Sequence, residues 1–348
     1  MSEEKQIGRD DLILVTGATG FIGPAVVESL LQHGFRNIRA MARPSSNMQR
    51  LEGIVKRCKD GARVEVILGN LLSREDCGRA ARGVLLVIHL ATSGDKSFPA
   101  SFISSVVTTR NLLDATVREG VLRRFVNVSS FAVYANTQRS VLDENAPIEQ
   151  PAHIRGDAYT FAKVKQDEVV MDYGKRFQVP YVIVRPGSVY GPGKEGITGR
   201  VGIDSFGVFL HMGGSNRIPL TYIDNCADAI VLAGITQGVE GQVFNIVDDD
   251  LPSSRQFLRM YKRNVRRFRS YYVPRVVSYG LCWAWEKYTA WSEEQLPPAF
   301  NRSRWRAEWK KTRYSNEKLK KMLRWTPKVS MADGLNRYFA GCREKFHA

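Results

Sequence analysis

The sequence predicts an α/β fold in which a doubly wound parallel sheet is followed by a smaller, mostly helical C-terminal portion. Short apolar runs alternate with stretches of helical periodicity, which is the pattern of parallel strands joined by helices. The run Val84–Ala91 (VLLVIHLA) is apolar enough for a central strand that is buried on both faces. Another apolar run ends at Gly17, Gly20 and Gly23, which indicate a tight turn between a strand and a helix.

The stretch Leu12–Gly23 (LILVTGATGFIG) covers this strand, the turn and the start of the helix. It has the features of a site for a dinucleotide pyrophosphate. Such a site needs backbone N–H groups near the phosphates and the N-terminus of a helix. Gly17 and Gly20 would leave room for the cofactor, and Gly23 would let the helix lie close on the strand. The spacing is G-x-x-G-x-x-G rather than G-x-G-x-x-G, and an ordinary connection is the alternative. The strand before the turn and the apolar helix after it favour the cofactor site.

The second strand, predicted at Ile38–Ala42, follows the helix that ends at Gly34. An NAD-binding protein of this type usually has an acid at the end of this strand, for the adenosine ribose hydroxyls. Met41 and Ala42 occupy those positions here, and Arg43 follows them. Because an arginine can bind a 2′-phosphate, we expect NADP to be preferred over NAD. The alternative is that Arg43 is simply exposed.

Three further elements extend the predicted sheet. Arg63–Gly69 alternates and then becomes apolar, as a third strand would. Phe102–Glu119 has helical periodicity and is closed by Gly120, and Phe125–Ser130 is the next strand. Ligands of such sheets bind outside the C-terminal ends of the strands, so the serines that end this strand are expected at the ligand-binding edge.

Tyr159 and Lys163 stand at the start of a helix predicted to run to about Phe177. Their spacing of four residues puts both side chains on one helical face. An ammonium there lowers the pKa of the phenol from about 10, so that the tyrosine exchanges a proton near neutrality. Two other pairs share this spacing. Tyr190-Gly-Pro-Gly-Lys194 cannot be helical, however, and Tyr314 to Lys318 lies in the C-terminal portion.

The excess of basic residues lies in the C-terminal portion. The formal net charge is +16 over 348 residues. Residues 1–250 contain 28 basic and 28 acidic residues, whereas residues 251–348 contain 23 and 7 as well as all six tryptophans. This composition fits an anionic substrate, an anionic membrane surface or nucleic acid, and a solvated basic face over a partly aromatic core is the alternative. Because no DNA- or RNA-binding motif accompanies it, we expect no nucleic-acid partner.

The cysteines and the N-terminal residues predict a cytoplasmic protein. The five cysteines are odd in number and form no C-x-x-C pair, so neither a disulfide framework nor a metal site is expected. The first ten residues, MSEEKQIGRD, are polar and contain no apolar segment of a secretory signal.

A second long helix is predicted from Pro274 to Trp291 and is apolar on nearly all sides. It is too short to span a bilayer, which takes about 20 apolar residues. Our first interpretation is a helix buried in the C-terminal portion or in a dimer interface. The alternatives are a lid over a hydrophobic substrate and a helix that rests on anionic lipid, with peripheral membrane contact through residues 274–311.

These motifs together resemble the extended short-chain dehydrogenase/reductase family, which includes NAD-dependent epimerases/dehydratases and 3β-hydroxysteroid dehydrogenases. They occur in the order found in that family, cover residues 12 to about 250, and are followed by a family-like ending. The matching residues are Thr16-Gly-Ala-Thr-Gly-Phe-Ile-Gly23, His89-Leu-Ala-Thr92, Asn111-Leu-Leu-Asp-Ala115, Val128-Ser-Ser130, Tyr159-x-x-x-Lys163, Arg185-Pro-Gly-Ser-Val-Tyr-Gly-Pro192, Tyr222-Ile-Asp224, Leu323-Arg-Trp-Thr-Pro327 and Asp333-Gly-Leu335.

The resemblance implies how the chain is divided. Residues 10–190 would form a Rossmann-type dinucleotide-binding domain, with a further strand and helices returning from about 220–250. Residues 191–220 and 251–348 would form the substrate-binding portion. A homodimer is also expected from the resemblance.

The resemblance also assigns roles to individual residues. Tyr159 is implied as the catalytic acid/base, Lys163 as the residue that holds the ribose hydroxyls and tunes Tyr159, and Ser130 as the group that binds the reacting oxygen. Ser130 is preferred to Ser129 because it stands three residues before Val133-Tyr134. The residues implied to bind NAD(P) are Gly17, Thr19, Gly20, Phe21, Ile22, Gly23, Arg43, Asn70, Leu71, Leu90, Ala91, Thr92, Tyr159, Lys163, Pro186, Gly187, Ser188 and Val189, with Asn70 replacing the usual aspartate. The candidate substrate contacts are Ser130, Thr92 and Arg217.

The implied reaction is hydride transfer between nicotinamide C4 and a secondary alcohol or ketone. The alternative within the family is a nucleotide-sugar epimerase or dehydratase, which uses bound NAD without net redox change. Ser188 stands where nucleotide-sugar enzymes usually have asparagine, which favours an alicyclic or sterol-like alcohol. Arg217 and the basic C-terminal portion instead suit a nucleotide diphosphate. A cofactor-sensing binding protein is a third hypothesis, against which the intact Ser130, Tyr159 and Lys163 set argues.

Overall fold

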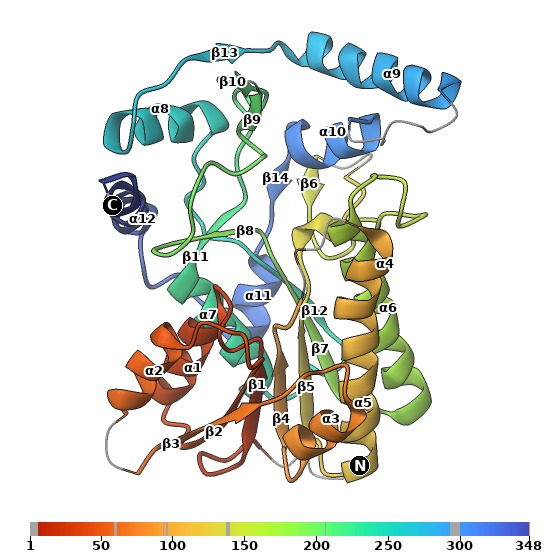
Figure 1. Cartoon of the computed structure of the whole chain (residues 1–348), viewed down its shortest axis with the longest axis vertical. Coiled ribbons are helices and arrows are strands. Elements are labelled where there is room, and N and C mark those ends of the chain that lie inside the picture. Colours follow the sequence, from red (N-terminus) through yellow and green to blue (C-terminus); the bar gives the residue numbers. More distant parts are fainter. Residues whose placement is uncertain are drawn as a thin grey trace.

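A seven-stranded sheet, with all strands parallel, forms the centre of the computed structural model (Figure 1). The structure describes residues 6–58, 61–92, 94, 97–136, 140–205, 207–292 and 300–347. The strand order is β12-β7-β5-β4-β1-β2-β3, so the direction of winding reverses between β1 and β4. The strands are β1 (Ile13–Thr16), β2 (Asn37–Ala42), β3 (Arg63–Leu68), β4 (Leu86–His89), β5 (Arg124–Val128), β7 (Tyr181–Pro186) and β12 (Val243–Ile246). The predicted doubly wound parallel sheet is confirmed.

Helices cover both faces of the sheet (Figure 1). One layer contains α1 (Gly23–Gln32), α2 (Gln49–Lys56), α7 (Ile223–Ile235) and α11 (Glu317–Leu323). The other contains α3 (Arg74–Ala81), α5 (Thr108–Glu119) and α6 (Ala158–Phe177). Leu86, Val87 and Ile88 of β4 are fully buried between the two layers, which explains why this strand is apolar at every position.

The helix predicted from Phe102 begins earlier and is not α-helical throughout. α4 (Phe98–Ser101) runs into a π-helix, η1 (Phe102–Val107), and then into α5. Hydroxyl groups in this stretch donate to carbonyls of the preceding turn: Ser104 Oγ to Ala100 O (2.6 Å) and Thr109 Oγ1 to Ser105 O (2.6 Å). Such side-chain bonds compete with the backbone ladder and accompany the wider turn.

A second group of elements lies beyond the C-terminal edge of the sheet, in the upper half of Figure 1. The residues between β5 and α6 lie outside the seven-stranded sheet. Their strand, β6, pairs in parallel with β14 from the C-terminal portion. Two other small sheets are β8 with β11, and β9, β10 and β13. The elements are η2 (Phe131–Val133), β6 (Val141–Leu142), β8 (Ser188–Tyr190), β9 (Gly202–Ser205), β10 (Val208–His211), β11 (Leu220–Tyr222), α8 (Ser254–Asn264), β13 (Ser270–Tyr272), α9 (Arg275–Trp291), α10 (Arg302–Trp309), β14 (Arg313–Tyr314) and α12 (Met331–His347).

The C-terminal residues return to the core of the sheet. Leu319, Trp325 and Phe339 belong to the same apolar cluster as β1 and α1. The Trp325 indole donates from Nε1 to the carbonyl of Asn225 in α7 (3.1 Å). The last third of the chain therefore contributes to the main core as well as to the upper half.

Helix α9 has the predicted bounds but not the predicted burial. Val276 is 85 % exposed, Leu281 61 % and Trp291 78 %. The interpretation of a helix buried in the C-terminal portion is therefore wrong. Part of the segment 274–311, residues 293–299, lies outside the described residues. Among the described helices, none is long and apolar enough to cross a membrane.

Candidate active site

A cavity of about 1070 Å³ lies along the C-terminal edge of the sheet. It extends from the turn after β1, past the end of β2, to the strand end of β5 and the start of α6. This is where a doubly wound sheet binds its ligands. It brings together Gly17, Thr19, Gly20, Phe21, Ile22, Gly23, Arg43, Asn70, Leu71, Leu90, Ala91, Thr92, Ser130, Tyr159, Lys163, Pro186, Gly187, Ser188 and Val189.

The glycine turn has space for backbone only. Gly17 has φ of +68°, and a Cβ there would lie 2.9 Å from the amide nitrogen of Ala91. A Cβ on Gly23 would lie 2.3 Å from the carbonyl oxygen of Gly17. Gly23 therefore lets α1 approach the turn itself, rather than the strand as the sequence suggested. No side chain caps the N-terminus of α1, so this cradle and helix end fit the pyrophosphate of a dinucleotide.

Polar groups line the cavity at the end of β2, where an adenosine would lie. Arg43 is exposed at this edge, and Ser45, Ser46 and Asn47 line the cavity beside it. The amide of Ser46 donates to the carbonyl of Arg43 (2.9 Å), which closes the turn that carries these side chains. Sequence reasoning found Arg43 but missed the three polar residues, because they follow no recognisable motif.

The loop after β3 is held in place by its neighbours. The Asn70 amide group accepts from the backbone of Leu72 through Oδ1 (3.0 Å). Asn111 of α5 donates through Nδ2 to the carbonyl of Leu71 (3.0 Å). The Asn70 NH₂ is the other group of this amide, and it can donate to an adenine in place of the usual carboxylate.

Ser130, Tyr159 and Lys163 meet at the far end of the cavity. Asp157 begins α6 by accepting the backbone N–H of Thr160 (2.7 Å), which fixes Tyr159 in the first turn. The Ser130 hydroxyl hydrogen-bonds the Tyr159 phenol, and Tyr159 remains 38 % exposed toward the open space. Lys163 is buried, and its Nζ donates to the carbonyl of Val128 (2.7 Å).

The expected effect of Lys163 on the Tyr159 pKa is not found. Desolvation raises the pKa of Tyr159, and the Ser130 hydrogen bond opposes this in part. The ammonium of Lys163 is engaged by the Val128 carbonyl and by Gln166 instead. Burial in turn lowers the pKa of Lys163 to about 8, against the opposing effect of Asp167. The two side chains share a helical face, as predicted, but burial and not their mutual attraction sets both pKa values.

A buried chain of hydrogen bonds runs from β1 to Lys163. His89 lies between Thr16 (Nδ1 to Oγ1, 2.7 Å) and Thr109 (Nε2 to Oγ1, 2.8 Å). The Thr109 hydroxyl donates to a carbonyl of its own helix and accepts from Gln166 Nε2 (2.8 Å). Gln166 Oε1 accepts from Lys163 Nζ (2.9 Å). Because burial lowers the pKa of His89 to about 3, the histidine is neutral. Since the Thr109 hydroxyl already donates to a carbonyl, it accepts from His89, and the ring proton is therefore on Nε2.

Ser129 and Ser130 have different partners although they are neighbours. The Ser129 hydroxyl donates to Asp167 Oδ2 (2.9 Å), which also accepts from Arg185 Nη2 (3.1 Å). The Arg185 guanidinium lies over the Tyr134 ring, 4.9 Å from its centre. Ser129 is thus part of a buried network that ties β5 to α6 and β7, whereas Ser130 bonds the phenol of Tyr159.

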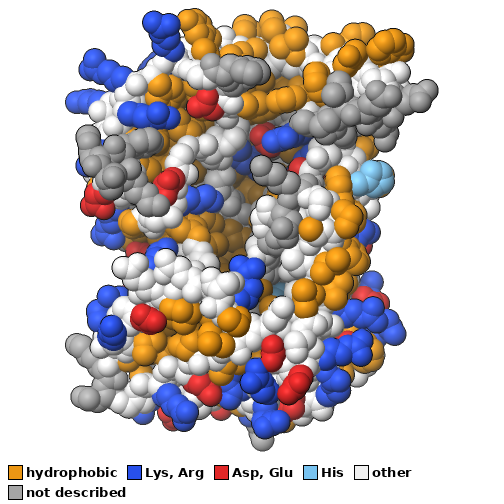
Figure 2. Space-filling view, viewed as in Figure 1, with side chains coloured by type: hydrophobic (Ala, Val, Ile, Leu, Met, Phe, Trp, Pro, Cys, Tyr) orange, Lys and Arg blue, Asp and Glu red, His pale blue; other side chains and the backbone are white. Residues whose placement is uncertain are grey.

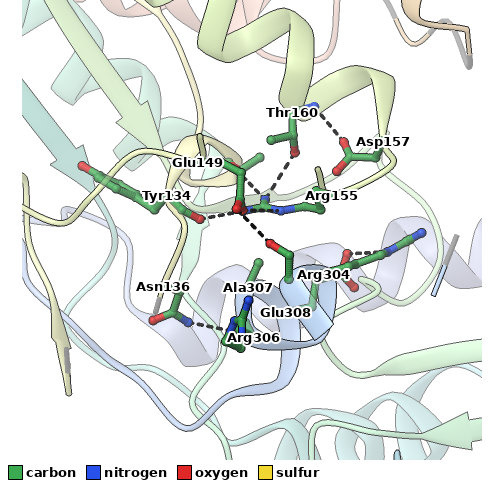
Figure 3. A network of polar contacts seen from close by, with 12 residues as sticks. Tyr134, Asn136, Glu149, Arg155, Asp157, Thr160, Arg304, Arg306, Ala307 and Glu308 are labelled. Carbon is green, nitrogen blue, oxygen red and sulfur yellow. Dashed lines mark hydrogen bonds and ion pairs between the residues drawn. The ribbon is translucent and has the colours of Figure 1, made fainter. Parts of the chain in front are cut away.

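A second buried network holds the loop between Ser130 and Tyr159 (Figure 3). Arg155 and Glu149 form an ion pair in which both side chains are nearly fully buried. Arg155 also donates from Nη2 to the carbonyl of Tyr134 (2.6 Å). Ser303 of α10 donates to the second oxygen of Glu149 (2.8 Å). The C-terminal portion therefore fixes the segment that carries the candidate catalytic residues.

The region beside Ser188 combines Gly187, which the sequence predicted, with residues that sequence reasoning missed. A Cβ on Gly187 would lie 2.2 Å from the carbonyl oxygen of Pro219, so only glycine lets β8 pass β11 here. Lys194 lies 5.5 Å above the Phe21 ring, and burial lowers its pKa. Apolar side chains complete this end of the cavity, among them Ile197, Leu220, Phe257 and Tyr338. They come from separate elements, so no spacing in the sequence connects them.

Arg217 is not among the described residues that line the cavity. Its guanidinium donates to the carbonyl of Leu251, and its backbone forms a bridge with Ser253. The structure thus separates it from the other candidate substrate contacts. No group of three or more potential metal ligands is found in the described part of the chain.

Comparison with known proteins identifies the family. A model of the NAD-dependent epimerase/dehydratase family matches residues 13–247. The chain belongs to this family. The resemblance to extended short-chain dehydrogenases/reductases is thereby confirmed, and so is the prediction of an enzyme.

Relatives within the family have different activities. The Arabidopsis thaliana 3β-hydroxysteroid-dehydrogenase/decarboxylase isoform 2 is 26 % identical over 63 % of this chain, which spans 40 % of that protein. The Mus musculus sterol-4-alpha-carboxylate 3-dehydrogenase, decarboxylating, is 24 % identical over 93 % of this chain and 88 % of its own length. The dTDP-glucose 4,6-dehydratase DesIV of Streptomyces venezuelae shares the fold, with a TM-score of 0.73 and 19 % identity over 97 % of this chain and 98 % of that one.

Proposed function

We propose that this protein is an NADP-dependent dehydrogenase or reductase that interconverts a secondary alcohol and a ketone on an alicyclic, sterol-like substrate. The observation that carries the proposal is a single cavity with Ser130, Tyr159 and Lys163 at one end and Arg43 at the other. The glycine turn lies between these two ends. The dinucleotide-binding domain would comprise residues 10–190 and the strand and helices near 220–250, with the substrate-binding portion at 191–220 and 251–348.

In the proposed mechanism, the bound cofactor would supply the redox chemistry: its reduced form would donate a hydride to the substrate carbon and its oxidised form would accept one. Tyr159 exchanges its phenolic proton with the substrate oxygen, and Ser130 donates a hydrogen bond to that oxygen. Lys163 would hold the ribose hydroxyls of the cofactor. Because desolvation raises the pKa of Tyr159, the phenol is protonated at neutral pH and is ready to act as an acid.

Two observations support a sterol-like substrate over a nucleotide sugar. Apolar side chains from β11, α8 and α12, namely Leu220, Phe257 and Tyr338, line the cavity beside the charged Lys194 and Glu195. Arg217, the candidate partner of a nucleotide diphosphate, donates to Leu251 instead. Two sterol-active relatives support the same class. A nucleotide-sugar dehydratase or epimerase remains the second candidate, since DesIV has the same fold.

The catalytic part of the proposal is tested with Tyr159→Phe. Oxidation of a 3β-hydroxysteroid is followed by NADPH absorbance, and cofactor binding is measured separately by NADPH fluorescence. We expect kcat to fall by about 10²–10⁴ while cofactor affinity is kept, because the lost group is a general acid/base. Tyr271→Phe, on an exposed tyrosine of β13, is the control and should leave kcat unchanged. Full turnover in Tyr159→Phe would refute the assignment.

The cofactor and reaction type are separated by two measurements. Denaturing the purified protein and identifying any released dinucleotide by mass distinguishes resident NAD, expected of an epimerase, from an exchangeable cofactor. Arg43→Ala should weaken NADPH binding but leave NADH binding unchanged, because only the former has a 2′-phosphate. Arg74→Ala, at another exposed arginine of this edge, is the matched control. Resident NAD, with UDP-glucose converted to an isomer without net redox, would support the second candidate.

We also propose a homodimer that forms through α6 and the η1–α5 helix, and a location in the cytoplasm. Ile103 is 48 % exposed and Phe177 46 % exposed on these neighbouring helices. A groove between the helices is lined by charges of both signs, including Arg110 and Glu168, as a self-complementary interface requires. Ile103→Glu should convert a dimer to a monomer in analytical ultracentrifugation, and an unchanged mass would contradict this interface.

The cysteines support the proposed location in the cytoplasm. Those in the described part of the chain are all free thiols, which suits a reducing compartment.

A further inference from the structure

Helix α9 is amphipathic in the opposite sense to an ordinary surface helix. The side that contacts the protein carries small and polar residues, since Ser278, Cys282 and Thr289 are its buried positions. Ser278 Oγ accepts from the Trp305 indole of α10 (2.9 Å). Glu286 accepts from Arg302 Nε (2.6 Å). The inner side is therefore anchored by hydrogen bonds, and the apolar side chains are directed away from the protein.

The outer side of α9 and the adjoining strand β13 form a continuous exposed apolar face. Large apolar side chains cover the top of the molecule in Figure 2, along the path that α9 follows in Figure 1. Their exposed fractions include 85 % for Val276, 61 % for Leu281 and 49 % for Trp283. Other members of this face are Tyr271, Tyr272, Val277, Tyr279, Tyr288 and Trp291. Exposed apolar groups gathered in this way mark an interaction site, because scattered ones would need no explanation.

Basic residues accompany the apolar face. Lys and Arg side chains gather at one side of the same end of the molecule (Figure 2). Arg263 near the end of α8, and Arg267 and Arg269 between α8 and β13, are exposed. From residue 263 to residue 291 the sequence has six basic residues and a single acid, Glu286, which is paired with Arg302. The occupant of this face is therefore expected to be apolar and anionic at once.

We propose that the outer face of α9, together with β13 and the arginines before it, docks on an anionic phospholipid bilayer. The helix has 17 residues, and at about 1.5 Å per residue it is too short to cross the hydrocarbon core but can lie in the interface. Its exposed Trp and Tyr side chains suit that boundary, since they combine an apolar ring with a polar group. The arginines meet the phosphates and acidic headgroups.

A second copy of the chain fits this face less well than lipid does. In a two-fold dimer the same patch meets itself. The arginines on both copies would then approach one another, and the described residues 263–291 contain only one acid, Glu286, which is already paired with Arg302. An acidic bilayer removes this repulsion and buries the apolar side chains as well, so charge complementarity favours lipid.

The test is co-sedimentation of the full-length protein with vesicles of phosphatidylcholine alone or mixed with phosphatidylserine. We expect binding to the mixed vesicles that weakens as salt is raised, because screening reduces the arginine contribution. Leu281→Ser should weaken binding about tenfold through lost apolar burial. Leu68→Ser is the matched control, because Leu68 has a similar exposed fraction, 54 % against 61 % for Leu281, but lies on β3.

The arginine contribution is tested with Arg263→Gln, Arg267→Gln and Arg269→Gln combined. This variant should lose most of the preference for phosphatidylserine and most of the salt dependence. Circular dichroism and NADPH binding verify that each variant is folded. Wild-type protein that binds neither kind of vesicle would overturn the proposal, as would binding that Leu281→Ser leaves unchanged.

Tryptophan fluorescence distinguishes docking of this face from binding elsewhere. Trp291 is 78 % exposed and Trp283 49 % exposed, whereas Trp305, Trp309 and Trp325 are buried. The emission should therefore shift to the blue when vesicles bind, and Trp283→Phe with Trp291→Phe should abolish most of that shift. If Leu281→Ser instead dissociates an oligomer in ultracentrifugation, and the wild type ignores vesicles, the face is an interface between copies and the proposal fails.

Discussion

A methyl group at position 23 has no space in this structure, which makes Gly23→Ala a sharp test of the cofactor site. The added Cβ would lie 2.3 Å from the carbonyl oxygen of Gly17 and 2.6 Å from Ala18 Cα, whereas real contacts stay beyond 3.0 Å. The backbone of α1 or of the turn must therefore move by about 0.7 Å. Overpacking of this kind costs about 1–3 kcal/mol.

This strain falls on the backbone that would receive the pyrophosphate, so it should appear in cofactor binding as well as in stability. We expect NADPH to bind about 5- to 150-fold more weakly, which corresponds to 1–3 kcal/mol. Gly78→Ala is the matched control, because Gly78 is also in a helix but its added Cβ would have nothing within 4 Å. That change should leave binding intact and stabilise α3 by up to about 1 kcal/mol. Fluorescence titration with NADPH and urea unfolding measure both effects, and wild-type affinity in Gly23→Ala would refute the close approach on which this reasoning depends.

Three further predictions concern buried polar groups. Burial raises the pKa of Asp248 to about 6, so the folded state holds this proton more tightly than the unfolded state does. Urea unfolding should therefore show about 1 kcal/mol more stability at pH 5 than at pH 7 from this group, and Asp248→Asn should abolish the difference. Gln166→Met breaks the chain that orients Lys163, and should lower kcat/KM on the order of tenfold and displace the alkaline limb of its pH profile, which Lys163 would set near 8. An unchanged profile would contradict a positioning role for Gln166. Arg155→Met leaves Glu149 as a buried, unpaired charge and should destabilise the protein by about 3–5 kcal/mol, whereas Arg176→Met, in an exposed pair, should change stability by less than about 1 kcal/mol.

The sequence predicted the sheet and its ligand edge well because both are encoded locally. Apolar runs of four to six residues mark the strands, and parallel connections bring their C-terminal ends to one edge. That is why Gly17, Asn70 and Tyr159 could be assigned to one site although they are far apart in the chain. Their roles as cofactor and catalytic residues remain predictions for the experiments above.

The sequence was less informative where a side chain's role depends on distant partners. Ser45 and Phe257 line the cavity but belong to no motif, since their position follows from how separate elements meet. Arg217 looked suitable by charge alone, and the structure turns it toward Leu251. The π-helix from Phe102 to Val107 also has the same apolar spacing as an α-helix, so periodicity did not distinguish them.

Two quantities were decided by tertiary structure alone: the direction of pKa shifts and the direction in which helix α9 faces. Spacing placed Tyr159 and Lys163 on one face, but desolvation by the surrounding protein raises the first pKa and lowers the second. Periodicity likewise grouped the apolar residues of α9 without saying which side is inward, because that depends on the hydrogen bonds that Ser278 and Glu286 make with Trp305 and Arg302 of α10. The sequence by itself determined the fold, the family and the candidate residues, since these depend on local pattern and order. Burial and orientation depend on the sum of contacts from distant segments, and only the folded chain brings those segments together.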